Sequence, residues 1–145
     1  MSVEDFNLES FIPFRVHQAS EAVSQSFRNI YRDEFGMTRS EWRVFAHLGQ
    51  YGSMTATEIG KSASLHKTKV SRALMALEKR RWLIRETDGN DRRVQRLGLT
   101  KAGLKVFGQL GTHASQYNLD LTKRLGEKDA KTLLRMMEKL LKSVD

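Results

Sequence analysis

The sequence predicts a mainly α-helical chain that carries one small β-hairpin. Apolar residues recur at spacings of three and four along most of its 145 residues, which is the period of an amphipathic helix. This period is interrupted once, by two short alternating segments on either side of a polar turn. Positive charge gathers in the same central part of the chain. Because 145 residues is a usual size for one domain, we expect a single domain over residues 1–145.

A long first helix is predicted near the N-terminus. Its apolar residues repeat at helical spacing and are Ile12, Val16, Ala19, Val23, Phe27 and Ile30. Ser10 is the expected N-cap. Pro13 falls in the first turn, where its missing N–H removes no helical hydrogen bond, and Gly36 is expected to end the helix.

Two capping boxes open the next two helices. In each box a threonine hydroxyl accepts a hydrogen bond from the third helical N–H, and a glutamate reaches back to the threonine N–H. The first box pairs Thr38 with Glu41 and opens a helix that ends near residues 49–52. The second pairs Thr55 with Glu58 and opens a short helix.

A third helix and a hairpin follow. Residues 67–80 have an apolar face, formed by Val70, Leu74 and Leu77. Residues 83–87 and 94–99 then read as two strands around a polar turn at 88–91. Two short helices followed by such a hairpin predict a winged helix-turn-helix over residues 37–103.

The charge distribution points to a polyanion. Residues 61–105 hold 13 Lys and Arg against four acids, a net charge of +9, whereas the rest of the chain holds 12 basic and 13 acidic residues, a net charge of −1. Such a concentration is typical of a nucleic-acid-binding face, because each cation that neutralises a phosphate releases counterions. The alternative is a solvated basic surface.

A basic helix beside a basic hairpin fits the two grooves of B-DNA. The major groove admits one α-helix, and side chains near its N-terminus reach the base edges. The candidate contacts on this recognition helix are His66, Lys67, Thr68, Lys69 and Arg72. A hairpin tip can enter the minor groove, whose negative potential attracts arginine. The candidate contacts of this wing are Arg92 and Arg93 at the tip, with Arg85 and Arg96 on the strands near the DNA backbone.

Each of these residues could instead contact a phosphate or be an idle surface charge.

Asp91 stands beside the two arginines of the wing tip, which is unusual because phosphates repel a carboxylate. We interpret it as the orienting partner of an arginine. The alternative is an ordinary turn aspartate that accepts hydrogen bonds from its own backbone.

The two C-terminal helical patterns predict an interface between copies. Each of these helices, residues 107–121 and 130–144, has an apolar stripe, and together the stripes form more apolar surface than a small winged domain can cover. We therefore expect residues 1–36 and 104–145 to be dimerisation helices. A two-fold axis would place two recognition helices about 34–36 Å apart and predicts a palindromic operator.

Several motifs together resemble one family. They are LEKRR at 77–81, the strand ending in Arg85, DGNDRR at 88–93 with the following Leu97, Leu99, Thr100 and Gly103, and the segments 36–38 and 41–44. These residues resemble the MarR family, the multiple-antibiotic-resistance-type regulators, and the resemblance extends helix by helix over nearly the whole chain. The wing motif leading into Leu-Thr is the most specific part.

The resemblance implies an obligate homodimer in which the first helix and the last two interlock. It also implies a sequence-specific transcription regulator, usually a repressor that covers a palindromic promoter site and is released by a small anionic, often phenolic, compound. By position, Arg93 would be the arginine in the minor groove and Asp91 would hold the wing in shape. Trp82 stands where the family commonly has glycine after the recognition helix. Because tryptophan does not favour a left-handed cap, this junction must close differently.

The resemblance also implies a pocket for a small effector. Five residues lie on or near the helices that usually line the family's pocket: Phe14, His17, Trp42, Arg43 and His47. An arginine or histidine beside aromatic rings could bind an aromatic carboxylate. The alternative for Trp42 is packing in the core, and for His17 a place on the surface or at the dimer interface.

Several classes of protein are disfavoured. The absence of cysteine removes disulfides, thiolate metal sites, cysteine nucleophiles and thiol redox sensing. The four histidines are scattered and no Gly-rich phosphate loop follows a strand, so we expect no enzyme, metal or cofactor. The acidic start and short apolar runs predict a cytoplasmic protein. The remaining alternative is a winged-helix module that binds RNA or a protein without reading DNA sequence.

Overall fold

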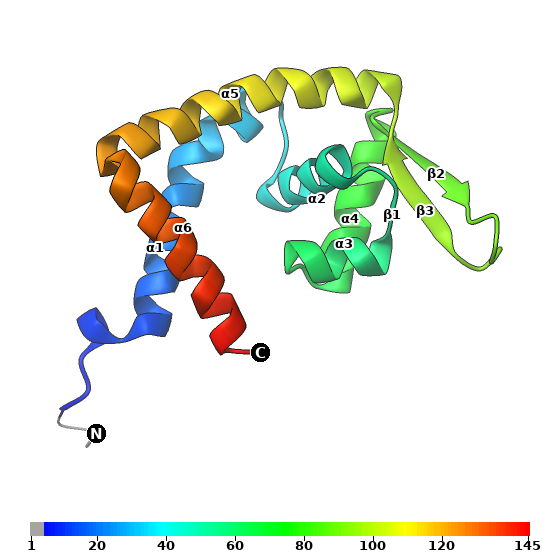
Figure 1. Ribbon diagram of the computed structural model, residues 1–145. Helices are drawn as coiled ribbons and strands as arrows, with labels where there is room; N and C mark the ends of the chain where they lie inside the picture. Colours follow the sequence, from blue (N-terminus) through cyan, green and yellow to red (C-terminus); the bar gives the residue numbers. More distant parts are fainter. Residues whose placement is uncertain (1–4) are drawn as a thin grey trace. The chain divides into compact units, whose positions relative to one another are not determined.

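The computed structural model describes residues 5–145, which form two compact units. The first unit ends at Leu110 and the second runs from Gly111 to Asp145. Figure 1 follows the chain from α1 to α6. The predicted fold class is confirmed, because the chain is mainly helical and carries one small antiparallel sheet.

The first helix, α1, is Ile12–Arg28 and continues as a π-helical turn, Asn29–Glu34. Ser10 as its N-cap is wrong. Residues Leu8–Ser10 form a separate 3₁₀ turn, and the Ser10 hydroxyl donates back to the Asn7 carbonyl at 3.2 Å. Pro13 lies in the first turn of α1 as expected, and Gly36 ends the helical stretch with φ +67°.

The next two helices begin at the predicted caps. They are α2 (Arg39–Tyr51) and α3 (Ala56–Ala63). The Thr38 hydroxyl accepts from the Glu41 N–H at 3.2 Å, and the Thr55 hydroxyl accepts from the Glu58 N–H at 3.1 Å. In both boxes the glutamate carboxylate accepts from the threonine hydroxyl, so the return contact is between side chains.

The recognition-helix candidate is α4 (Lys67–Lys79), and its apolar face is buried as predicted at Val70, Leu74 and Leu77. Strands β2 (Leu83–Thr87) and β3 (Gln95–Leu99) pair in antiparallel fashion and form the wing hairpin. A third strand, β1 (Met54–Thr55), pairs with β3 and gives the sheet the order β1-β3-β2. Two residues are too short for a period, which is why the sequence does not reveal β1.

The core of the first unit joins α2, α3 and α4 to the sheet. Its fully buried side chains include Phe45, Leu48, Ile59, Leu77 and Leu97. The Phe45 ring packs against Trp82 at 5.6 Å and against Phe107 at 5.9 Å between centroids. These contacts pack α2 against the residue that precedes β2 and against the helix that follows the wing.

The residue that ends α4 in the left-handed conformation is not Trp82 but the residue before it. Arg81 takes the left-handed conformation, with φ +64°. Its N–H donates to the Glu78 carbonyl at 2.9 Å, and the Trp82 N–H donates to the Leu77 carbonyl at 3.1 Å. This is the Schellman pattern with arginine at the position that glycine usually takes. Trp82 therefore needs no left-handed conformation and directly precedes strand β2.

The last two helices are α5 (Lys101–Leu125) and α6 (Glu127–Ser143), separated by Gly126 with φ +91°. Within residues 111–145, α6 leaves a broad apolar face exposed. Its exposed members are Leu133, Leu134, Met136, Met137 and Leu141.

Candidate nucleic-acid interface

The N-cap and the first two turns of α4 present the five predicted recognition residues to solvent. His66 is the N-cap, and its Nδ1 accepts from the Thr68 N–H at 3.2 Å. Lys67, Thr68, Lys69 and Arg72 are exposed. Because the apolar face of α4 is buried beneath them, these four side chains project away from the core. His66 therefore has a local structural role whether or not it touches DNA.

Arg72 and Lys69 also face the start of α2. Together with Thr38, Ser40 and Glu41 they line a shallow hollow of about 340 Å³. The arrangement brings two cations of α4 beside the capped N-terminus of α2, where backbone N–H groups and the helix dipole favour an anion. The Glu41 carboxylate, which accepts from the Thr38 hydroxyl, already lies at this place and offsets part of the positive charge.

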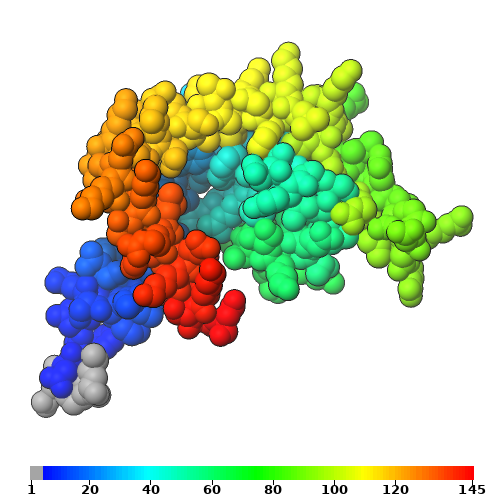
Figure 2. All heavy atoms as spheres, viewed as in Figure 1, coloured from blue at the N-terminus to red at the C-terminus, as the bar shows by residue number. Residues whose placement is uncertain are grey.

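The wing tip carries two exposed arginines, Arg92 and Arg93. The Arg93 side chain is 92% exposed. Figure 2 shows the hairpin tip projecting clear of the helices of its own unit. A slender, cationic projection of this kind can reach into a groove that the body of the protein cannot enter.

Asp91 contacts Arg93 through both its backbone and its side chain. One carboxylate oxygen accepts from the Arg93 N–H at 3.0 Å and from Nε at 3.3 Å, and the other accepts from Nη2 at 3.4 Å. The backbone N–H of Arg93, and then its guanidinium, hold the pKa of Asp91 below its ordinary value of 3.8. Both interpretations of Asp91 thus describe contacts that coexist in the free protein.

Arg85 and Arg96 make contacts inside the unit. Arg85 Nε lies 2.7 Å from the Glu78 carboxylate of α4, and Nη1 lies 3.4 Å from Gln95 across the hairpin. Arg96 donates to the hydroxyl and the carbonyl of Ser53 at 2.8 and 2.9 Å. The structure therefore separates the four wing arginines into two exposed at the tip and two held at the base.

A hollow of about 590 Å³ lies between α3, α4 and β2. Its apolar floor includes Val70 and Leu74, and its cationic rim includes Lys61, Lys67 and Arg85. None of the five predicted effector residues lines it.

The described contacts link some of the five effector candidates, since His17 and Arg43 both lie near enough to Glu21 to interact with its carboxylate and His47 contacts Arg43. Trp42 packs among aromatic rings, 5.3 Å from Phe27 and stacked 6.4 Å from Tyr31 between centroids. His47 Nδ1 lies 2.6 Å from the Arg43 carbonyl, one turn earlier on α2. His17 is exposed and Phe14 is partly exposed.

Two further arginines, Arg80 and Arg39, hold parts of the first unit together and were not among the residues predicted from the sequence. Arg80 donates to the carbonyl of Phe35 at 2.8 Å and to that of Gly36, and its guanidinium lies 4.9 Å from the centre of the Trp82 ring. Arg39 pairs with Glu21 of α1 at 2.8 Å, which lowers the pKa of that carboxyl. No sequence signal distinguishes these arginines from the DNA-binding candidates, since their partners are distant in the chain.

Among the residues that the structure describes, no group of three or more His, Cys, Asp or Glu side chains is suited to hold a metal ion. Across residues 5–145, none of the helices has the length and hydropathy needed to cross a bilayer.

Comparisons with known proteins agree with this geometry. The model of the MarR family matches residues 35–94, from the end of the first helical stretch to the wing. The HTH-type transcriptional regulator FarR of Neisseria gonorrhoeae is 26% identical over 128 residues, which cover 88% of this chain and 87% of FarR.

Solved structures share the fold over almost the whole chain. The MarR family transcriptional regulator SPO1453 from Silicibacter pomeroyi superposes with a TM-score of 0.85 at 25% identity, covering 97% of this chain and 100% of that one. NadR in complex with 4-hydroxyphenylacetate gives a TM-score of 0.81 at 24% identity, with 97% of each chain covered.

Proposed function

Because this chain belongs to the MarR family of DNA-binding transcriptional regulators, we propose that it is a homodimeric repressor of a palindromic promoter site. In this proposal a small aromatic anion releases it from DNA. The observation that carries the proposal is the pairing, in one unit, of an exposed cationic helix start with an exposed pair of wing arginines.

The recognition helix is proposed to read the major groove. Lys67, Thr68 and Lys69 occupy the first turn of α4, and lysine can donate to guanine O6 or N7 while threonine offers a hydroxyl or a methyl group. Arg72 follows one turn later and is suited to a phosphate or a base edge. Contacts of these side chains would carry the sequence specificity.

The wing is proposed to insert into the minor groove of the DNA. Arg93 is the inserted arginine, and Asp91 fixes its backbone and guanidinium before DNA arrives. Such preorganisation lowers the entropy lost on binding. Arg92 is proposed to contact the flanking DNA backbone.

Dimerisation is supported by the apolar face of α6. Leu134 and Leu141 are 72% and 68% exposed in the single chain, on a face too apolar to remain in water. A second copy is the simplest partner, and its two-fold axis requires a palindromic operator.

The effector is proposed to be a phenolic or aromatic carboxylate. NadR, whose fold this chain shares, has been crystallised with 4-hydroxyphenylacetate. In this chain Arg43, His47 and His17 are the proposed partners of the carboxylate or phenol, with Phe14 and Trp42 beside the ring. Trp42 already packs against Phe27 and Tyr31, so its part would be to form one wall.

A mobility-shift assay tests the regulator proposal. The full chain is titrated against a duplex from upstream of its own gene, with an excess of random duplex as competitor. We expect a complex that survives random DNA and is lost to the unlabelled upstream duplex. Equal competition by random DNA, or stronger competition by single-stranded RNA, would refute it. Added 4-hydroxyphenylacetate tests the effector proposal separately.

A further inference from the structure

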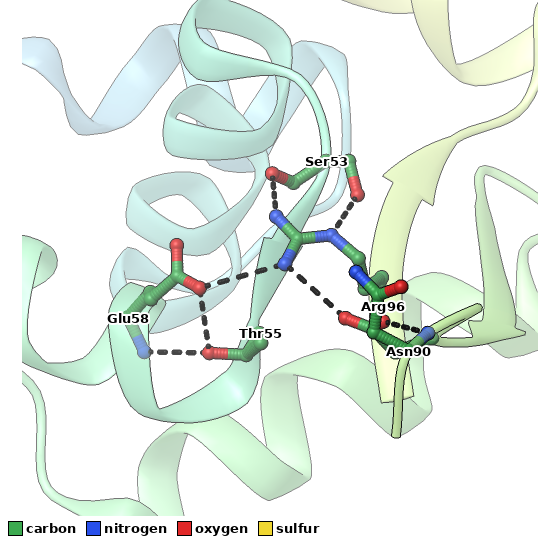
Figure 3. A network of polar contacts seen from close by, with 6 residues as sticks. Ser53, Thr55, Glu58, Asn90 and Arg96 are labelled. Carbon is green, nitrogen blue, oxygen red and sulfur yellow. Dashed lines mark hydrogen bonds and ion pairs between the residues drawn. The ribbon is translucent and has the colours of Figure 1, made fainter. Parts of the chain in front are cut away.

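Arg96 lies at the centre of a polar cluster that joins the wing to the helix-turn-helix. It sits on β3, the middle strand, where it pairs with Thr55 of β1 on one side and Glu86 of β2 on the other. We call Arg96, Ser53, Glu58 and Asp88 the Arg96 cluster. Figure 3 shows the guanidinium pointing from the strand toward Ser53 and Glu58.

The guanidinium uses all three of its nitrogens within the protein. Nε donates to the Ser53 hydroxyl at 2.8 Å, and Nη2 donates to the Ser53 carbonyl at 2.9 Å. Nη1 lies between two carboxylates, 3.8 Å from Glu58 and 3.9 Å from Asp88. This fork geometry is specific to arginine, because a lysine ammonium is a point charge and cannot reproduce it.

The Glu58 contact links the cluster to the start of α3. The same carboxylate oxygen that lies near Arg96 accepts from the Thr55 hydroxyl at 3.2 Å. That hydroxyl in turn accepts from the Glu58 N–H and caps α3. The Arg96 guanidinium therefore contacts the capped N-terminus of α3, which belongs to the helix-turn-helix.

The Asp88 contact links the cluster to the wing turn. While one oxygen of Asp88 lies near Arg96, the other accepts from the Asn90 N–H at 2.8 Å. The turn is closed further on by two backbone hydrogen bonds, from the Asp88 N–H to the Val94 carbonyl at 2.9 Å and from the Val94 N–H to the Asp91 carbonyl at 3.0 Å. Asp88 is thus the point at which the cluster holds the turn that carries Arg92 and Arg93.

Because of these contacts, Arg96 is a poor candidate to bind a phosphate of the DNA. Its side chain is only 36% exposed, against 92% for Arg93, and its fork is aimed at the protein. A phosphate would have to displace Ser53 or the two carboxylates.

We propose that Arg96 is a positioning residue, which anchors the wing turn through Asp88 to Ser53 and the capped start of α3 and so sets where Arg92 and Arg93 meet DNA. The proposal rests on the DNA-binding function above for its consequence. The anchoring itself concerns the free protein and can be judged without DNA.

The first test measures amide hydrogen exchange by NMR in the free, full-length protein. Arg96→Met removes the fork, and Asp88→Asn keeps an oxygen for the Asn90 N–H while removing the charge that faces Arg96. Glu86→Gln is the matched control, since it removes an acid from the same hairpin outside the cluster. We expect the Val94 amide to exchange about two- to fivefold faster in the first two variants, the range set by a part-exposed ion pair, and unchanged in the control.

Unchanged exchange at Val94 in Asp88→Asn would overturn the proposal, and so would equal acceleration in Glu86→Gln. Thermal unfolding of each variant is followed in parallel. If Arg96→Met does not fold, Asp88→Asn alone still decides between the outcomes.

The second test uses the sign of the effect on affinity for the upstream duplex. If electrostatics alone acted, removing the negative charge of Asp88 or of Glu86 would tighten binding to DNA. Positioning instead predicts that Asp88→Asn weakens binding about two- to fivefold, opposite in sign to Glu86→Gln. Arg96→Lys, which keeps the charge but loses the fork, should weaken binding too. Tighter binding by Asp88→Asn together with wild-type affinity in Arg96→Lys would overturn the proposal.

The two proposals fail in distinguishable ways. If the unmodified protein does not prefer its upstream duplex over random DNA, the regulator function fails. The exchange measurement at Val94 still decides whether Arg96 anchors the wing.

Discussion

Arg81 occupies a backbone conformation that glycine adopts at much lower cost. Its φ of +64° completes the turn that ends α4, and a side chain in this region is disfavoured by about 1 kcal/mol or more. We expect Arg81→Gly to raise the free energy of unfolding by about 1 kcal/mol, measured by denaturant unfolding. Lys79→Gly, at the last residue of α4, should lower it by at most about 1 kcal/mol, because glycine is the poorer helix former. A loss of stability in Arg81→Gly would mean that contacts of its side chain outweigh the strain.

Asp91 gives the wing a defined response to acid. Because the Arg93 N–H and guanidinium lower its pKa in the folded protein, the contact stabilises the wing above the unfolded pKa near 3.8 and is lost as the pH falls through the lower folded value. We expect NMR titration of the Asp91 carboxyl to give a midpoint below 3.8. In Arg93→Ala the midpoint should rise only part of the way, because the backbone N–H is the larger cause. Titration at or above the ordinary value would contradict the observed contacts.

At the scale of elements, the start of α5 depends on a close approach to the strand that follows α4. The Thr100 N–H donates to the Trp82 carbonyl at 2.9 Å, and a Cβ on Gly103 would lie 2.3 Å from that same oxygen. We expect Gly103→Ala to destabilise the protein by about 1–3 kcal/mol, the usual cost of overpacking. Gly108→Ala, in the same helix with open space at its Cβ, is the control and should be neutral or slightly stabilising. Thermal unfolding of the two variants would separate these outcomes.

The wing acts as an element through its tip. Arg93→Ala removes the most exposed cation of the hairpin without touching the core, so we expect operator affinity to fall while the dimer and the melting temperature stay unchanged. The salt dependence of binding should also become shallower by about one counterion. Lys79→Ala, another exposed cation on the same unit but at the far end of α4, is the control. Unchanged affinity in Arg93→Ala would refute the wing assignment.

For the whole molecule, the decisive surface is the apolar face of α6. Replacing Leu134 and Leu141 by Asp would place two charges in the proposed interface, where burial without a partner is costly. We expect light scattering to report monomers or unfolded chains. Lys139→Asp, on the same helix but outside its apolar stripe, should leave the dimer intact. A folded dimer of the double variant would overturn the interface proposal.

Much of this fold is readable from the sequence because its causes are local. Helix period, capping boxes and the hairpin turn act over a few residues, so α2, α3, α4 and the wing begin close to where they are predicted. Ser10 failed as a cap because Asn7 offered a competing turn three residues earlier, and β1 was missed because two residues carry no period.

The sequence by itself determined that a basic helix and a basic hairpin would lie in one unit, and that its C-terminal helices would have apolar faces. Only the tertiary structure decided which arginines are free to meet DNA. Arg93 is held by a neighbour two residues away, whereas Arg96 bonds to a residue 43 positions away and Arg80 to one 45 positions away. A guanidinium has the same charge in either setting, so its role depends on which partners the fold brings within hydrogen-bonding distance.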